Sequence, residues 1–274
     1  MLGKLFKHEW RSISRLLLPV HGGVLLFALL SRMYFIIGGG FDHLTMSGNT
    51  LINTLTGILI FALCLVLFSA CIFTYIYSGY RFYKNVFTDE GYLTNTLPVT
   101  PAQIILSKGL AAFLWLLIDI IVVAVSACIL IADKEFFSVL FGSFFPEVWA
   151  MALKVPVFSI LAALSLLLSP FILITMLYVS ISVGSLFPSH KILGAIGTYI
   201  GIYVINQIFG FIELIIFGFN QWAETIPALP GNYPEYFQKC MNPIMICSNI
   251  FTILCILLCW FGTKYIMTKK LNLQ

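Results

Sequence analysis

His21, Asp119 and Glu213 lie inside long apolar stretches of the sequence, and they are the side chains there that could do chemistry. Asp119 comes 11 positions after Lys108. An α-helix would therefore carry it about 16 Å along its axis, near the middle of a bilayer. A carboxyl group at that depth is costly and usually faces protein or a water-filled cavity. Asp119 is thus a candidate pathway residue that contacts substrate or accepts a proton. The alternative is a protonated or hydrogen-bonded acid with a structural role.

The two other ionisable groups are less specific. His21 lies near the basic start of the first apolar stretch and could pair with Asp119, but its position fits a packed, hydrogen-bonded side chain equally well. Glu213 comes late in its stretch, so a place at the membrane interface is as consistent as a functional one.

Motifs for other chemistries are missing from the sequence. It has no Gly-x-x-x-x-Gly-Lys-Ser/Thr loop for nucleotide and no HExxH or GxSxG motif. Its seven cysteines show no metal-ligand spacing and mostly fall in apolar stretches, where cysteine acts as a small hydrophobe. We therefore predict no catalytic residue, no metal site and no cofactor bound by this chain.

A stripe of small residues follows from Gly194 through Gly197 to Gly201. Small residues let membrane helices approach closely. The stripe predicts close helix packing, either within one protomer or between two.

The elements that carry these residues follow from composition. The 274-residue chain is 60% hydrophobic and only 9% charged, which is typical of an all-α polytopic membrane protein. Six apolar runs are long enough to cross a bilayer. They are 16–37, 51–80, 102–132, 151–187, 192–217 and 243–267. The fourth is longer than a bilayer requires, and its Ser169-Pro170 pair favours a kink.

The first 15 residues form a separate pattern. Apolar side chains fall on one helical face and basic side chains around the other, which predicts a helix in the headgroup layer. A signal peptide is the alternative, but no convincing cleavage site follows. We therefore divide the chain into an interfacial helix, 1–15, and a six-helix transmembrane domain, 16–274.

Basic residues predict the orientation. Eleven lie near one set of helix ends: Lys4, Lys7, Arg11, Arg15, Arg81, Lys84, Lys108, Lys191, Lys264, Lys269 and Lys270. The other ends carry four: Arg32, Lys134, Lys154 and Lys239. Because basic residues concentrate in cytoplasmic loops, we expect both termini and the loop around residues 81–101 to be cytoplasmic.

This loop belongs to the longest polar interval that also carries basic residues, Arg81–Lys108. Thr100, Pro101 and Gln103 predict a helix start with a capping box. The preceding residues mix Asp89 and Glu90 with large apolar side chains, as expected of a segment that docks on a surface. On the opposite side, the aromatic segment 218–242 is expected to dip into the outer interface.

The string FTDEGYLTNTLPVTPAQIILSK, residues 87–108, resembles the first cytoplasmic loop of ABC transporter permeases of the bacterial type-2 exporter family. Elsewhere the chain resembles this family mainly in helix count and spacing. The resemblance implies a coupling helix that binds the ATPase subunit. Its residues here are Phe87, Asp89, Glu90, Gly91, Tyr92, Leu93, Leu97 and Pro98.

The resemblance also implies short re-entrant helices in the outer segment and two permease subunits, identical or different, around a central pathway. Their first and fifth helices would form the dimer contact. ATP and magnesium would bind the separate ATPase subunit at the cytoplasmic loops, and this chain would lie in the bacterial cytoplasmic membrane.

The expected function is export of an amphipathic or hydrophobic cargo, such as a peptide, lipid or drug. The partners would be the ATPase, a second permease subunit and membrane lipids, with no nucleic acid. The alternative is a membrane sensor or scaffold that transports nothing and binds a cytoplasmic regulator through the same loop.

Overall fold

The computed structural model describes residues 1–38, 49–88, 90–91, 98–131, 133–219 and 233–269. Every regular element in these residues is a helix. The α-helices are α1 (Leu2–Ile37), α3 (Thr50–Phe87), α5 (Pro101–Ile131), α6 (Lys134–Val139), α7 (Phe145–Lys154), α8 (Pro156–Gly184), α9 (Lys191–Glu213) and α11 (Tyr233–Lys269). Two π-helices, η1 (Leu140–Phe144) and η2 (Leu214–Phe219), interrupt the α-helical run.

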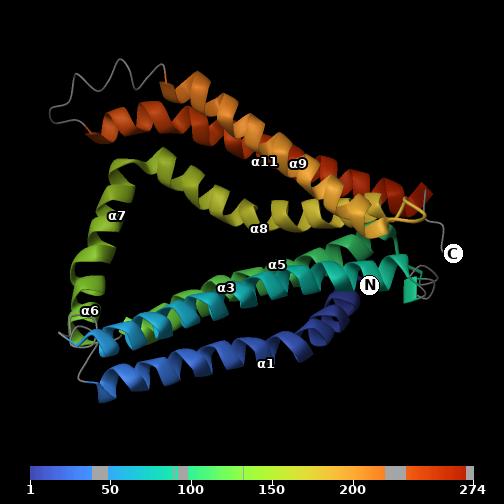
Figure 1. Ribbon diagram of the computed structural model, residues 1–274. Helices are drawn as coiled ribbons and strands as arrows, with labels where there is room; N and C mark the ends of the chain where they lie inside the picture. Colours follow the sequence, from blue (N-terminus) through green and yellow to red (C-terminus); the bar gives the residue numbers. More distant parts are fainter. Residues whose placement is uncertain (39–48, 89, 92–97, 132, 220–232, 270–274) are drawn as a thin grey trace. The chain divides into compact units, whose positions relative to one another are not determined.

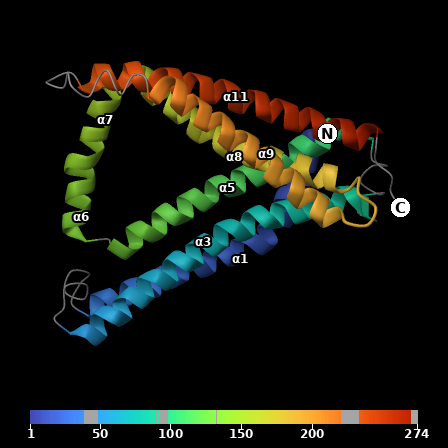
Figure 2. The ribbon, with the colours of Figure 1, turned by 45° about the horizontal axis from the view of Figure 1, so that its top comes forward.

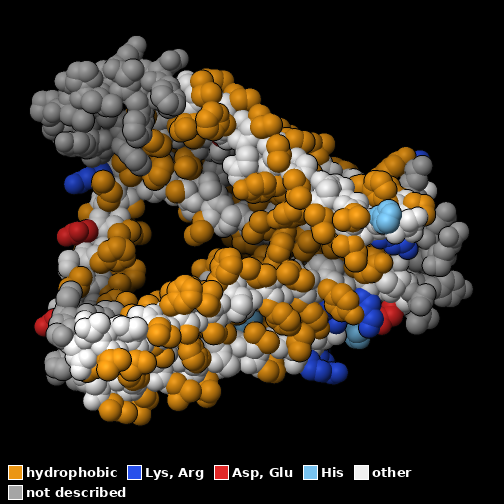
Figure 3. Space-filling view, viewed as in Figure 1, with side chains coloured by type: hydrophobic (Ala, Val, Ile, Leu, Met, Phe, Trp, Pro, Cys, Tyr) orange, Lys and Arg blue, Asp and Glu red, His pale blue; other side chains and the backbone are white. Residues whose placement is uncertain are grey.

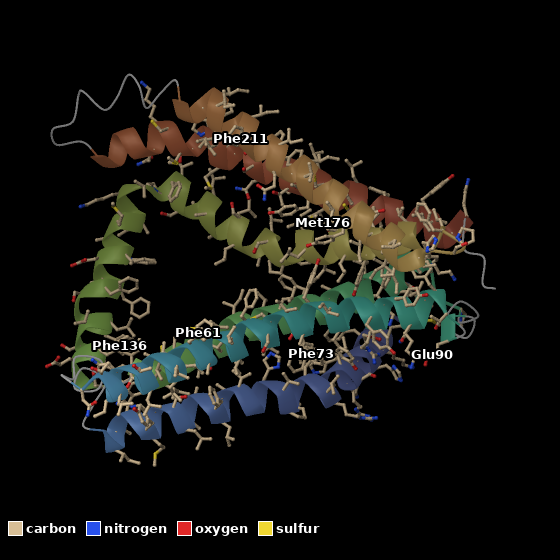
Figure 4. The ribbon with its side chains drawn as sticks, in the orientation of Figure 1. Phe61, Phe73, Glu90, Phe136, Met176 and Phe211 are labelled. Carbon is tan, nitrogen blue, oxygen red and sulfur yellow. The ribbon has the colours of Figure 1, made fainter. Side chains whose placement is uncertain are left out.

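Seven helical segments of the described chain are long and apolar enough to cross a membrane, which is the pattern of a multi-pass membrane protein. Large apolar side chains remain exposed along them, including Phe61 of α3 and Phe211 of α9, both labelled in Figure 4. Hydrophobic side chains cover much of the visible surface, while charged ones gather at a few places (Figure 3). The exposed apolar surface fits a lipid environment, because water would penalise it.

The chain forms two compact units. The first contains residues Met1–Ser78 and Leu106–Ser143 and is built on α1, α3 and α5, which lie side by side in Figures 1 and 2. Polar contacts join α1 to α5 at sequence separations of 99, 98 and 98 residues, so these two helices run parallel in one register. The helix between them in sequence, α3, runs antiparallel to both. The buried core of this unit includes Leu17, Val24, Ala28, Phe35, Leu63, Ala70, Ala111, Trp115 and Val122.

The N-terminal segment is continuous with the first apolar run. Residues 2–37 form one helix of 36 residues, with no break near residue 15, where we expected the interfacial helix to end. Figure 1 shows α1 changing direction in its N-terminal half, and Pro19 lies inside the helix. A proline removes one backbone hydrogen bond and favours such a bend. Placement of the first 15 residues in the headgroup layer stays a prediction.

Helix α3 extends seven residues beyond the expected end of the second run. It contains 38 residues and continues from Thr50 to Phe87. A helix of that length measures about 57 Å, well beyond the roughly 30 Å of a hydrocarbon core. The first part of the predicted loop 81–101 is therefore helical, and α3 is long enough to project from the membrane.

The second unit contains residues Gly79–Ile105 and Phe144–Gln274. In it α8 and α11 run parallel, because Ser165 contacts Asn249 and, further along both helices, Val179 lies beside Gly262. Helix α9 runs antiparallel to α11: the rings of Phe209 and Phe251 stack with centroids 3.6 Å apart, and Ser248 contacts Glu213. Buried Met176, Val179 and Cys259 form the core of this unit.

The fourth apolar run is not one helix, as we expected for 151–187. It breaks at Val155, whose φ of −125° and ψ of 58° end α7, and Pro156 starts α8. Proline disfavours helical geometry in the residue before it and is well tolerated at the first helical position. Helix α8 then continues past the expected kink site, Pro170, and bends partway along its length in Figure 1.

Two further boundaries differ from expectation. The segment Glu135–Lys154 adds a seventh helix of spanning length, where the sequence pattern predicted a connection. Helix α11 starts at Tyr233, so residues 233–242 of the expected outer segment belong to a long helix. Residues 220–232 of that segment lie outside the described part of the chain, and its re-entrant form stays a prediction.

Candidate functional site

Asp119 lies in a buried polar centre of the first unit, with only 4% of its surface exposed. Its Oδ1 atom is 2.5 Å from Nε2 of His21 on α1 and 3.0 Å from the hydroxyl oxygen of Thr74 on α3. The other ring nitrogen of His21, Nδ1, is 2.7 Å from the carbonyl oxygen of Leu17. The pairing of His21 with Asp119, which the sequence left open, is thus present, and one carboxyl oxygen joins three helices.

An aromatic wall borders this centre. The ring of Trp115, one turn before Asp119 on α5, lies 5.2 Å from the ring of His21 and is buried. Trp10 of α1 stacks on Trp115 as well, with ring centroids 5.3 Å apart. Trp115 Nε1 and Asp119 Oδ2 are both buried and have no hydrogen-bond partner among the described residues. Buried polar atoms are nearly always satisfied, so this pair points to a missing polar ligand or water.

A second polar contact joins the same two helices nearer their N-termini. Lys108 Nζ of α5 lies 2.8 Å from Glu9 Oε2 of α1, and both side chains are about 7% exposed. Leaving one of these charges buried alone would be strongly unfavourable. The pair therefore fixes the register between the N-terminal segment of α1 and α5, the helix that follows the loop 81–101.

The second unit has its own buried carboxyl group. Glu213 is 4% exposed, and its Oε2 accepts a hydrogen bond of 2.7 Å from the Ser248 hydroxyl. Its Oε1 is buried without a partner among the described residues. Asn249 ties α11 to α8, donating to the Leu161 carbonyl at 3.2 Å and accepting from Ser165 at 3.1 Å. Glu213 is thus an interior residue of this unit.

The predicted loop is described only at its ends. The capping box is confirmed: the Thr100 amide donates to Gln103 Oε1 at 3.1 Å, the Gln103 amide donates to Thr100 Oγ1 at 3.4 Å, and α5 begins at Pro101. At the other end, exposed Glu90 pairs with Lys84 at 2.9 Å and lies just beyond α3 in Figure 4. Asp89, Tyr92, Leu93 and Leu97 lie outside the described residues.

The described loop residues differ in surroundings. Phe87 is half-buried, and its ring lies 5.8 Å from that of Phe82, which stacks on Tyr178 at 3.9 Å. At least one edge of Phe87 therefore serves internal packing. Gly91 is buried and donates its amide proton to the Thr88 carbonyl at 2.7 Å, while Pro98 is exposed.

The three glycines of the small-residue stripe are not equivalent. A Cβ atom on Gly194 would lie 2.4 Å from the Phe187 ring, so this glycine permits close packing inside the second unit. Gly197 and Gly201 have no neighbouring atom within 4 Å of such a Cβ. They leave a shallow, open face on α9.

The sequence analysis did not identify Thr74 and Trp115 as neighbours of Asp119. It also did not identify the buried ion pair between Glu9 and Lys108. A usable signal was the spacing itself: Glu9, His21 and Arg32 recur at three-turn intervals on α1, and each faces α5.

In chemical terms the centre around Asp119 can hold a proton or a small polar group. No cluster of three metal-ligating side chains occurs in the described part of the chain.

Comparison with known proteins gives no relative. No protein-family model matches the chain, and neither do the curated proteins or solved structures with which it was compared.

Proposed function

We propose that this chain is the membrane permease subunit of an ATP-driven bacterial exporter of the ABC type. The observation that carries the proposal is the segment between α3 and α5. The helix before it, α3, is longer than the bilayer is thick, and its end carries the exposed charges of Lys84 and Glu90. A capping box then begins the next helix, α5, at Pro101. The sequence of this segment is also the part that resembles the first cytoplasmic loop of such permeases.

The mechanism follows from which elements the loop connects. An ATPase that pushes on residues 87–98 would act on the end of α3 and the start of α5 together. Helix α5 is tied to α1 by the buried Glu9–Lys108 pair and by His21–Asp119. A displacement of α5 would therefore carry α1 with it, because separating buried charges is costly. We infer that these two parallel helices move as one body during transport.

The remaining parts of the proposal concern assembly and topology. Two such subunits, identical or different, would enclose the cargo pathway, with six spans each and both termini in the cytoplasm. Gly197 and Gly201 on the open face of α9 would meet the partner subunit. An apolar cavity would suit amphipathic cargo such as a peptide, lipid or drug.

The test is to co-express the chain with an ABC ATPase subunit from its own operon and measure copurification and ATP turnover in lipid vesicles. Leu93→Ala should release the ATPase or uncouple its activity, because an apolar anchor of this kind typically contributes about 2 kcal/mol or more to an interface. Glu90→Gln should be milder, since an exposed charge contributes little.

Two variants make the result specific. Phe61→Ala changes an aromatic side chain of α3 that is 65% exposed and lies far from the loop, so it should leave ATPase binding unchanged. Phe87→Ala also removes a contact with Phe82, so it tests stability and binding together. Normal ATPase association and turnover in the Leu93 variant would make the loop a simple connector and remove the main support for the transporter.

A further inference from the structure

We propose that α1, α3 and α5 enclose a proton-binding site, formed by His21 and Asp119 and hydrated by one water molecule held between Trp115 and Asp119. This inference concerns the first unit alone and does not depend on the proposed function.

The tautomer of His21 is fixed by its neighbours. A backbone carbonyl can only accept a hydrogen bond, so the 2.7 Å contact with the Leu17 oxygen places a proton on Nδ1. The second nitrogen, Nε2, faces Asp119 Oδ1 at 2.5 Å. Two unprotonated acceptors would repel each other at this distance, so one proton lies between them.

That proton defines two forms of the pair with the same net charge. It resides on His21 as an imidazolium beside a carboxylate, or on Asp119 as a carboxylic acid beside a neutral imidazole. Both forms are neutral overall, which a low-dielectric interior favours over a single buried charge. Loss of the proton to bulk water would leave a negative charge on Asp119. The two acceptors, His21 Nε2 and Asp119 Oδ1, would then repel each other, so α1 and α5 would separate at this contact.

The side chains around the pair do not compete with His21 and Asp119 for this proton. From α3, Thr74 offers a hydroxyl, and Cys71 interacts electrostatically with Asp119. On α5 the nearest cation is Lys108, which is held by Glu9 of α1. None of these contacts offers a free carboxylate or imidazole that would take the proton from the pair.

The water follows from two complementary unsatisfied atoms. Trp115 Nε1 is a donor and Asp119 Oδ2 an acceptor, both buried without a partner among the described residues. They lie four residues apart on one helix, where side chains are neighbours. A water molecule accepts from the indole and donates to the carboxylate, whereas a cation would satisfy only the carboxylate and an anion only the indole. Water is therefore the ligand that matches both atoms.

The experiment uses the full-length protein in lipid nanodiscs, labelled with ¹⁵N at histidine and tryptophan. Replacing His8, His43 and His190 by glutamine leaves His21 as the sole source of imidazole signals. We expect Nδ1 to stay protonated while Nε2 changes state in one step as the pH rises, with release of one proton. Asp119→Asn should abolish this step, because an amide cannot share a proton in the same way.

Controls separate the site from general effects. Glu213→Gln removes the buried carboxyl of the second unit and should leave the His21 titration unchanged. The Trp115 indole proton should exchange magnetisation with water. The Trp260 indole nitrogen is also buried without a partner among the described residues, but it lies one turn from Lys264 rather than a carboxylate, so it should not.

Two results would overturn the proposal. An unchanged His21 titration in Asp119→Asn would show that the pair does not share the titrating proton. A Trp115 indole without contact to water, or equal contact at Trp260, would remove the hydrated site.

Discussion

At the scale of single residues, the buried charge pair Glu9–Lys108 gives the sharpest stability prediction. Glu9→Gln leaves the Lys108 ammonium group in a buried position without its carboxylate, which typically costs about 3–5 kcal/mol. We expect the unfolding midpoint of the detergent-solubilised protein to fall accordingly. Lys7→Gln, which changes an exposed charge on the same helix, is the matched control and should have little effect.

A double variant distinguishes the pair from either residue alone. Glu9→Gln combined with Lys108→Met removes both charges, so most of the lost stability should return. If the double variant is less stable than Glu9→Gln, other interactions of Lys108 are more important than this ion pair.

Residue-scale prediction from sequence succeeded where the signal is local. The capping box at Thr100 and Gln103 depends on four consecutive positions, and it is present with the expected proline. The buried pair Glu9–Lys108 was missed because its members are separated by 99 residues. Their contact depends on the register between two parallel helices, and register follows from packing along the whole seam.

At the scale of elements, the joint between α8 and α9 depends on Gly184. A Cβ atom there would lie 2.6 Å from both the Ala195 amide nitrogen and the Lys191 carbonyl oxygen. Both are backbone atoms, so α8 and α9 would have to move apart. Gly184→Ala should therefore lower the free energy of unfolding by roughly 1–3 kcal/mol, as overpacking does. Chemical denaturation in mixed micelles would measure it.

Gly197→Ala is the matched control, because nothing lies within 4 Å of a Cβ at this position. Alanine is the better helix former by up to about 1 kcal/mol, so this variant should be neutral or slightly more stable. Equal destabilisation of both variants would indicate that glycine flexibility, and not the close approach at Gly184, determines the effect.

The observed helix boundaries show why the number of helices is harder to predict from the sequence than the fold class. The all-helical membrane fold follows from composition and the length of the apolar runs, and α5 ends within one residue of its predicted limits. The sequence predicts the fourth run as one segment because residues on both sides of Val155 are apolar. Only Pro156 marked the break, and a proline inside an apolar run is equally consistent with a kink, as at Pro170.

At the scale of the whole molecule, the two units share one topology. Each has two parallel helices, α1 and α5 or α8 and α11, with an antiparallel helix between them in sequence. Each also contains one buried carboxyl group that accepts a hydroxyl hydrogen bond, from Thr74 in one unit and Ser248 in the other.

The side of the membrane on which the ends of α8, α9 and α11 lie depends on the segment Glu135–Lys154, which is long enough to be a seventh span. If it crosses the membrane, Lys191, Lys264 and Lys269 move to the outer side and the excess of basic residues in the cytoplasm shrinks. If it lies on the outer surface, these lysines stay inside. The positive-inside rule therefore favours six spans.

Single cysteines in a background without the seven native ones test this directly. We expect Lys269→Cys to react with a membrane-impermeant maleimide only after the cells are opened, and Asn232→Cys to react in intact cells. Asn49→Cys and Asn85→Cys are the internal standards, because we expect them outside and inside, respectively, in both arrangements. Labelling of Lys269→Cys in intact cells, with Asn232→Cys protected, would establish seven spans and place the C-terminus outside. The loop between α3 and α5 would still face the cytoplasm, so ATPase docking there is compatible with either count.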